Sequence, residues 1–374
     1  MTDYVFLFVF ILLQAALIIQ LYFIVMMHGR LRSYKRTDPA DSEHPQLPVS
    51  VIICARNEEK NLEENLSLVL EQDYPSFEVV VVNDCSSDDS DLVLRQLSQK
   101  YPHLKVVTIK EHDRFKHGKK FAVTLGIKAA SNEHLLFTDA DCRPASAEWI
   151  NMMQQNFVKN TEIVLGYSPY YRGKGFLNAF IRFETFNTAI NYLSFALSGH
   201  PYMGVGRNLS YTKSLFFKNK GFASHIHIPS GDDDLFVNQN STRENTVIEI
   251  RSESQVWSWP KRTWSSYWKQ KIRHMGAGKA YKKRDKVILS VQTASAGLFY
   301  LLLFVLIVLK AQWWMLLGIY LVRLLVQLIV YYPTAKKLNN KDLLWWFPAL
   351  DLSYNFFIIV LSIISLFKKK VKWK

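Results

Sequence analysis

Acidic side chains recur at three places in the middle of this sequence, each next to an apolar run. The acids concerned are Asp84, Asp139, Asp141, Asp232 and Asp233. Carboxylate oxygens are the ligands that Mg²⁺ and Mn²⁺ prefer, and such ions often complete their shells with substrate phosphates. A carboxylate crowded by like charges has a raised pKa and can act as a general base. These residues therefore predict a divalent metal site and a proton acceptor.

The elements that must position these acids follow from the hydrophobic pattern. Four β-branched or apolar runs, typical of buried strands, occupy residues 48–55, 77–84, 104–110 and 133–141. Helical spacing lies between them, and strands alternating with helices predict a parallel sheet covered on both faces. Ligands of such sheets bind beyond the carboxyl ends of the strands. We therefore expect an α/β domain with its acids gathered at one edge.

Each acidic motif also has a plainer interpretation. The two carboxylates of Asp139-Ala140-Asp141 are equally typical of a turn or of a helix N-cap. The run Asp232-Asp233-Asp234 is typical of a charged turn that caps a helix. The position of the first motif after a buried strand, and the presence of both in one domain, favour the metal site and the base.

A basic segment covers residues 261–286, with ten Lys or Arg, one acid and several aromatic residues. This composition predicts an amphipathic helix lying at a membrane surface. Gln270 and Arg273 are three residues apart and would share one helix face, where Arg273 could bind a diphosphate through two parallel hydrogen bonds. Both interpretations can hold for different faces of the same helix.

The N-terminal residues 4–27 form an apolar run long enough to cross a bilayer core of about 30 Å. No Lys or Arg precedes this run, and four basic residues between Arg30 and Arg36 follow it. A cleaved signal peptide would show the opposite charge placement. The positive-inside rule then predicts an external N-terminus and a cytosolic middle domain.

Three further apolar segments lie in the C-terminal third. Residues 287–309 and 312–332 predict a membrane hairpin, whereas 343–367 is interrupted by Pro348 and Asp351. Four full crossings would place the lysine-rich tail 368–374 outside, against the charge rule. We therefore expect the last segment to be re-entrant or interfacial.

The net charge of +14 fits a membrane partner better than nucleic acid. Residues 28–287 hold 36 Lys or Arg against 29 acids, so half of the excess flanks the apolar ends. The sequence predicts an integral membrane protein, of the plasma or inner membrane if bacterial. The expected units are an N-terminal membrane helix (1–28), a linker (29–47), the catalytic domain (48–260), the basic segment (261–286), C-terminal membrane helices (287–367) and the tail (368–374).

Taken in order, the motifs form a family pattern. They read PVSVIICARNEE, VVVVNDCSSDD, HGKK, TDAD, GDDDLF and QKIRH before the membrane helices. This order resembles the membrane-bound family-2 glycosyltransferases, a group that includes ceramide glucosyltransferase, cellulose synthase and hyaluronan synthase. The resemblance covers about 48–275 and implies a GT-A fold, which is a Rossmann-like nucleotide-diphospho-sugar transferase domain.

The resemblance also implies roles for the matching residues. The donor-binding residues would be Ala55, Arg56, Glu58, Asp84, Lys119 and Asp139. Asp139 and Asp141 would hold Mg²⁺ or Mn²⁺ with the diphosphate, and Gln270 and Arg273 would match the QxxRW motif of the family. The catalytic base would be Asp233, with Asp232 as the alternative alignment. His274 stands where the family has Trp, which puts stacking on the acceptor in doubt.

The function implied is inverting, metal-dependent transfer of a hexose from a UDP- or GDP-sugar to an acceptor hydroxyl. A lipid or lipid-linked acceptor at the cytosolic leaflet is expected, because a few membrane helices are too few for a polysaccharide channel. A polysaccharide synthase with a saccharide acceptor is the alternative, and a nucleotide-sugar-binding scaffold is the non-enzymatic one. A dinucleotide oxidoreductase is disfavoured, because Ala55-Arg56-Asn57-Glu58 lacks the glycines of G-x-G-x-x-G.

Overall fold

A computed structural model describes residues 2–35, 46–110 and 118–367 of the protein. The lysine tail 368–374, whose side of the membrane the sequence left open, lies outside the described residues, as does most of the expected linker. Residues 29–33 of that linker are helical, because α2 (Gly29–Ser33) continues the first helix and buries Leu31.

A seven-stranded sheet forms the centre of the domain, in the order β3-β2-β1-β4-β7-β6-β8. Its strands are β1 (Val49–Ala55), β2 (Phe77–Asp84), β3 (Leu104–Ile109), β4 (His134–Asp139), β6 (Ile163–Gly166), β7 (Leu209–Thr212) and β8 (Thr246–Glu249). The first four are parallel, which confirms the predicted fold class, and β7 is inserted antiparallel to β4 and β6. The strand order reverses between β1 and β4, where Cys54 pairs with Asp139. Such a reversal is where doubly wound sheets bind ligands.

Helices cover both faces of this sheet. On one face α3 (Glu59–Leu70), α4 (Ser90–Lys100) and α6 (Trp149–Gln154) bury their apolar positions against the odd-numbered residues of β1. On the other face lie α5 (Lys119–Ala129) and the long helix α7 (Phe176–Leu197). The alternation follows from the strand period of two, which sends neighbouring side chains to opposite faces.

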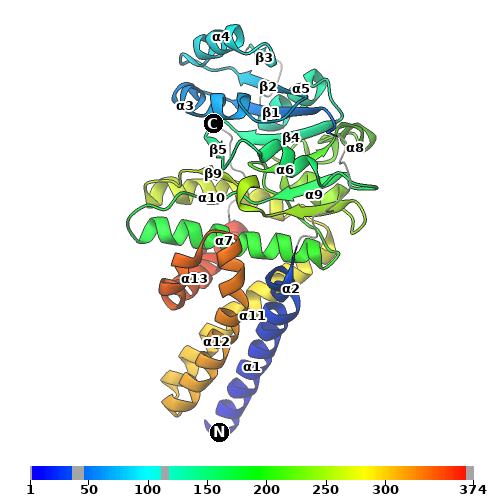
Figure 1. The fold of residues 1–374 in the computed structure, drawn as a ribbon. Coiled ribbons are helices and arrows are strands. Elements are labelled where there is room, and N and C mark those ends of the chain that lie inside the picture. The colour runs from blue at the N-terminus through cyan, green and yellow to red at the C-terminus, as the bar shows by residue number, and fades with distance from the viewer. Residues whose placement is uncertain (1, 36–45, 111–117, 368–374) are drawn as a thin grey trace.

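Helix α7 also joins the sheet to the helices below it (Figure 1). Its Phe183 ring packs edge-on against Phe347 at 5.5 Å between ring centres. Its buried Arg182 donates two hydrogen bonds of 2.7 Å to the Asp342 carboxylate. The hydrophobic core is therefore continuous from the sheet, through α7, into the apolar helices.

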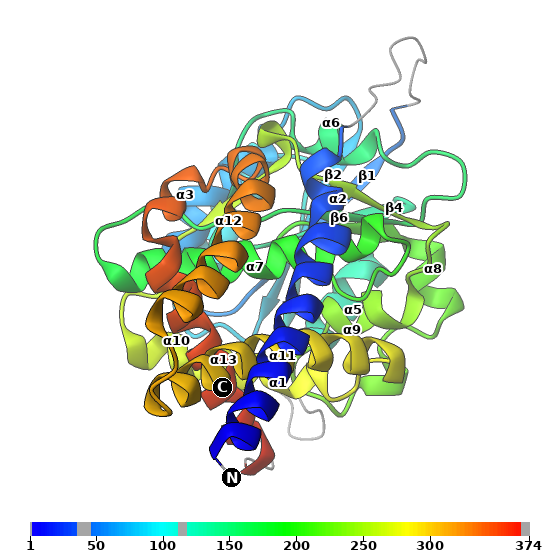
Figure 2. The same ribbon diagram turned by 90° about the horizontal axis from the view of Figure 1, so that it is seen from below.

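Four helical segments among the described residues are long and apolar enough to cross a membrane. They comprise α1 (Thr2–Tyr22) with the π-helical turn Phe23–His28 and α2, then α11 (Lys283–Val308), α12 (Trp313–Lys337), and the 3₁₀ turn η4 (Lys341–Trp346) with α13 (Phe347–Phe367). α1, α11 and α12 run away from the sheet, whereas α13 stays near α7 and contacts α10 (Trp264–Gly278) and α11 (Figures 1 and 2). The 3₁₀ turn η4 continues directly into α13 at Phe347, next to Pro348, and re-entrant topology for this segment stays a prediction.

A buried polar network explains the charges inside the apolar segments. Arg323 of α12 lies 2.7 Å from the Asp351 carboxylate of α13, and both side chains are nearly inaccessible. Tyr300 of α11 donates to the same carboxylate oxygen at 2.5 Å, and Arg323 also donates to Gln20 of α1 at 3.3 Å. Charges in an apolar setting are costly unless paired, so these contacts hold all four helical segments in one register.

We expect Arg323→Leu to destabilise the protein by about 3 kcal/mol, because it leaves the Asp351 charge buried without its partner. The double variant Arg323→Leu/Asp351→Leu should regain much of the lost stability, since no charge is then stranded. Apparent melting temperatures of the detergent-purified full chain measure both. Lys336→Leu, at an exposed site, is the matched control. If Arg323→Leu has the same apparent melting temperature as the wild type, a stabilising role for the pair is contradicted.

Candidate active site

Lys119, the first residue of α5, connects two acidic motifs that are far apart in sequence. Its Nζ lies 2.9 Å from Oδ1 of Asp139 and 3.4 Å from Oδ2 of Asp232. Burial would lower the pKa of Lys119, but these carboxylates and Asp233 outweigh it and hold the pKa well above its usual value. The amine is therefore a permanent cation. Cys54 and Gly206 line the same small cavity as Lys119 and the three acids.

The end of β4 supplies a candidate metal group. Ligand atoms of Asp139, Asp141 and Cys142 all lie within 4.8 Å of one another. Burial would raise the pKa of Asp139, but Lys119, followed by Arg207 and Arg273, keeps it below its usual value. Burial raises the pKa of the Cys142 thiol well above its usual value, so it stays protonated. The two carboxylates thus fit a hard divalent cation, whereas the neutral thiol does not.

Asp233 is the N-cap of α9 (Asp234–Asn240) and is held by two backbone donors. Gly206 N–H donates to its Oδ2 at 2.7 Å, and Asp234 N–H donates to its Oδ1 at 2.8 Å. Burial, followed by the neighbouring Asp232 charge, raises the pKa of Asp233 despite these bonds. A carboxylate held in this way, with a raised pKa and a cavity in front of it, has the properties of a general base.

The third acid of the run, Asp234, faces away toward the helices that follow the domain. Its Oδ2 accepts a hydrogen bond of 2.9 Å from the Tyr281 hydroxyl. Burial and the Asp233 charge raise the pKa of Asp234 to about 8. Further along α9, Asn238 donates to Asp285 in the first turn of α11 at 2.9 Å. The helix that begins with the acidic run is therefore attached to the start of an apolar helix.

The ends of β1 and β2 form the proposed nucleotide side. Asp84 is 4 % exposed, and its Oδ1 has no hydrogen-bond partner among the described residues. Asn57, at φ 55°, accepts a hydrogen bond from Ser87 N–H at 2.8 Å, which locks the two strand-end loops together. Such a buried, unpartnered carboxylate oxygen is costly and is typical of a site that waits for a ligand.

The other predicted donor residues lie around the same strand ends. Arg56 is exposed on the turn after β1, whereas the Ala55 side chain is buried in the core. Burial raises the pKa of Glu58, and the charges of Asp141 and Asp139 raise it further. Glu58 is therefore electrostatically coupled to the candidate metal group.

Helix α10 carries the predicted Gln270 and Arg273, which are both half-buried. The Arg273 charge lowers the pKa of Asp139, and its carbonyl accepts a hydrogen bond from Ser230 at 3.3 Å. Lys271 lies 2.5 Å from Glu184 and so attaches α10 to α7. The structure thus brings α10 to the acidic edge, while the role predicted for Gln270 stays a prediction.

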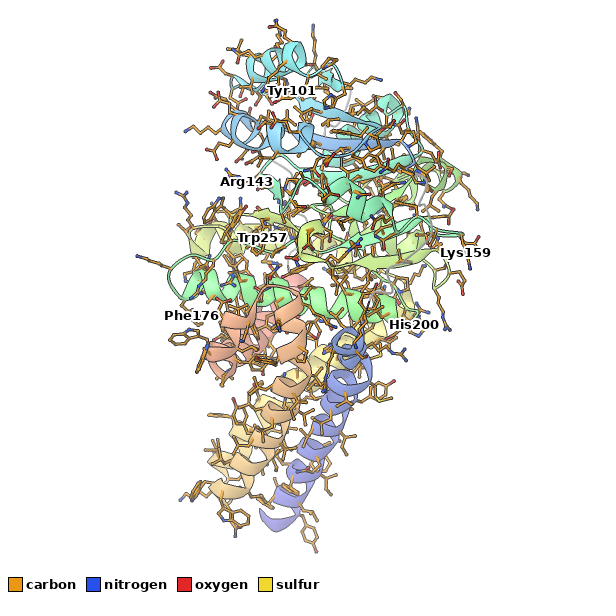
Figure 3. All side chains as sticks on the ribbon, in the orientation of Figure 1. Tyr101, Arg143, Lys159, Phe176, His200 and Trp257 are labelled. Atoms are coloured by element: carbon orange, nitrogen blue, oxygen red, sulfur yellow. The ribbon has the colours of Figure 1, made fainter. Side chains whose placement is uncertain are left out.

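Several residues at this edge were not predicted from the sequence. Gly206 and Arg207 reach it from the loop between α7 and β7. Tyr281, in the link between α10 and α11, contacts the far side of the acidic run at Asp234. The small sheet of β5 (Cys142–Pro144) and β9 (Val256–Ser258) continues the edge by pairing Arg143 with Trp257 (Figure 3). The sequence signal that could have found Gly206 and Arg207 is the glycine-containing stretch PYMGVGRN at residues 201–208.

Comparisons with known proteins agree with this geometry. A probable glycosyltransferase, YdaM, of Bacillus subtilis is 27 % identical over 71 % of this chain and 64 % of its own length. A poly-beta-1,6-N-acetyl-D-glucosamine synthase of Staphylococcus epidermidis is 26 % identical over 68 % of this chain and 60 % of its own length. The chain therefore spans less than two thirds of these relatives.

A solved mannosyltransferase, PcManGT from Pyrobaculum calidifontis in complex with GDP-Man and Mn²⁺, has the same fold. It superimposes with a TM-score of 0.59 at 16 % identity, covering 95 % of this chain and 99 % of its own. The model for "Glycosyl transferase family 2" matches residues 50–216. The domain of residues 50–216, with its GT-A sheet and the acidic edge beyond its strands, is therefore similar to glycosyltransferase family 2.

Proposed function

We propose that the chain is a membrane-bound, inverting glycosyltransferase that moves a sugar from a UDP- or GDP-sugar to an acceptor hydroxyl. The observation that carries this proposal is the contact of one lysine with both acidic motifs. One candidate metal ligand, Asp139, and the candidate base line the same cavity, and a direct displacement needs such groups close together. The relative YdaM supports the transferase class by its name, and the complex of PcManGT with GDP-Man supports a nucleotide-sugar donor.

Each group has one task in this scheme. Asp139 and Asp141 would hold Mg²⁺ or Mn²⁺, which when bound neutralises charge on the diphosphate. Arg273 would bind the departing diphosphate, and Asp84, Arg56 and Glu58 would hold the nucleoside side. Asp233 would accept the proton of the attacking hydroxyl, and Lys119 would keep the acids together while facing the donor.

A lipid or lipid-linked acceptor at the cytosolic leaflet fits the position of the cavity. Helices α7, α10 and α13 pack together between the sheet and the remaining apolar helices, and their contacts are mostly aromatic. An acceptor held in the membrane would reach the catalytic domain across this layer. The poly-N-acetylglucosamine synthase among the relatives favours a growing saccharide as the second candidate. Product length separates the two, since a lipid acceptor would receive one sugar and a synthase would make polymer.

A donor screen tests the proposal directly. Detergent-purified protein with Mn²⁺ or Mg²⁺ should release nucleotide from one UDP- or GDP-sugar, and chelation should abolish the release. Asp141→Asn and Asp233→Asn should each lower turnover by about 10²–10⁴-fold, because they remove a metal ligand and the proton acceptor. Asp73→Asn, at an exposed site away from the cavity, is the control. Nucleotide binding without release for every donor would favour a scaffold.

The pH dependence separates Asp233 from Asp232 as the base. A base works only when deprotonated, so turnover should fall as the pH drops through the pKa of Asp233, which burial and Asp232 raise. Asp232→Asn removes one of these two causes, so the acid limb of kcat should move to lower pH while turnover persists. The limb is measured in buffers of constant ionic strength. Complete loss of turnover in Asp232→Asn, with activity kept in Asp233→Asn, would assign the base to Asp232.

A further inference from the structure

Arg207 lies in the loop between α7 and β7, where its neighbours fix the backbone. Before it, Gly206 N–H donates to the Asp233 carboxylate at 2.7 Å. After it, the buried Asn208 side chain accepts a hydrogen bond from the Trp149 indole at 3.0 Å and donates to the Tyr167 carbonyl at 2.9 Å. A residue between two such anchors has little freedom, so the direction of its side chain is set by the fold.

The Arg207 guanidinium is held on two sides, and one of its nitrogens has no described partner. Its Nη2 donates to the Ser168 carbonyl at 3.1 Å, and its Cζ lies 4.3 Å from the ring centre of Tyr170. Its Nη1 is buried and has no hydrogen-bond partner among the residues that the structure describes. A buried donor without an acceptor is costly, and guanidinium groups pair best with carboxylates or phosphates. The Nη1 of Arg207 therefore lacks an anionic acceptor among the described residues.

The surroundings indicate where that acceptor belongs. Burial would raise the pKa of Asp139, but Lys119 and, after it, the Arg207 charge lower it. Burial would lower the pKa of Arg207, but Tyr170 and Cys142, followed by Asp141 and Asp139, raise it. Lys119 already neutralises Asp139 through a direct contact, and among the described contacts Arg207 donates to a carbonyl and to no carboxylate. Pairing with these acids is therefore not what the guanidinium is positioned for.

We propose that Arg207 binds the diphosphate of the donor through Nη1, beside the metal ligands and in addition to Arg273. This inference rests on the proposed function. The Tyr170 ring and the Ser168 carbonyl hold the guanidinium before the donor arrives, so little freedom is lost on binding. A fixed cation at this point also stabilises the negative charge that the leaving diphosphate gains when the sugar–phosphate bond breaks.

Nucleotide binding to the detergent-purified full chain tests this role. With Mn²⁺ present, the wild type should bind UDP or GDP more tightly than the corresponding UMP or GMP. Arg207→Gln should weaken diphosphate binding about tenfold or more, as loss of a charge-assisted hydrogen bond would, and leave monophosphate binding nearly unchanged. Arg207→Lys keeps the charge but not the planar fork, so its diphosphate affinity should lie between those of the wild type and Arg207→Gln.

Arg143→Gln is the matched control. It removes a guanidinium two residues from Asp141 that is paired with Glu64, so it should keep the preference for diphosphate. Two results would overturn the role of Arg207 and leave the proposed function standing. One is a preference for diphosphate in Arg207→Gln that equals that of the wild type. The other is an equal loss of diphosphate and monophosphate binding, together with a lower melting temperature in both Arg207 variants. Failure of the wild type to bind any of the four nucleotides overturns the proposed function and this inference together.

Discussion

One half-buried cation organises the acidic edge. Lys119 stands between Asp139 at the end of β4 and Asp232 before α9, and both contacts are within ion-pair distance. Without it, the carboxylates gathered at this edge would repel one another and raise each other's pKa values. The contact also fixes the distance between the candidate metal group and the candidate base, so the remaining elements of the domain are arranged around it.

The helix that follows Asp233 connects this edge to the apolar helices. Asn238 on α9 contacts Asp285 at the start of α11, and Tyr281 contacts Asp234. Below the domain, the Arg323–Asp351 pair holds the apolar helices together. The position of the acidic run is therefore set from both the sheet and the long apolar helices. Such double support is what a site needs when its groups must stay within a fraction of an ångström.

Much of the fold followed from local pattern. Strands β1 to β4 appear close to their expected bounds, because buried parallel strands require continuous apolar runs, and Asp84, Asp139 and Asp141 consequently meet at strand ends. The hydrophobic pattern shows Arg323 and Asp351 inside apolar segments. It does not predict that the two side chains contact each other, because they lie on different helices. Arg207 and Tyr281 were missed for the same reason: each belongs to a connecting segment whose conformation depends on distant contacts.

The sequence by itself determined the α/β class, the apolar segments and the acidic motifs, because each of these depends on periodicity or composition over a few neighbouring residues. Only the tertiary structure decided which lysine joins the two acidic motifs and which backbone donors hold Asp233. It also decided that Nη1 of Arg207 is buried without a hydrogen-bond partner among the described residues. Those contacts join residues dozens of positions apart. They are fixed by the packing of the whole domain, which no local pattern encodes.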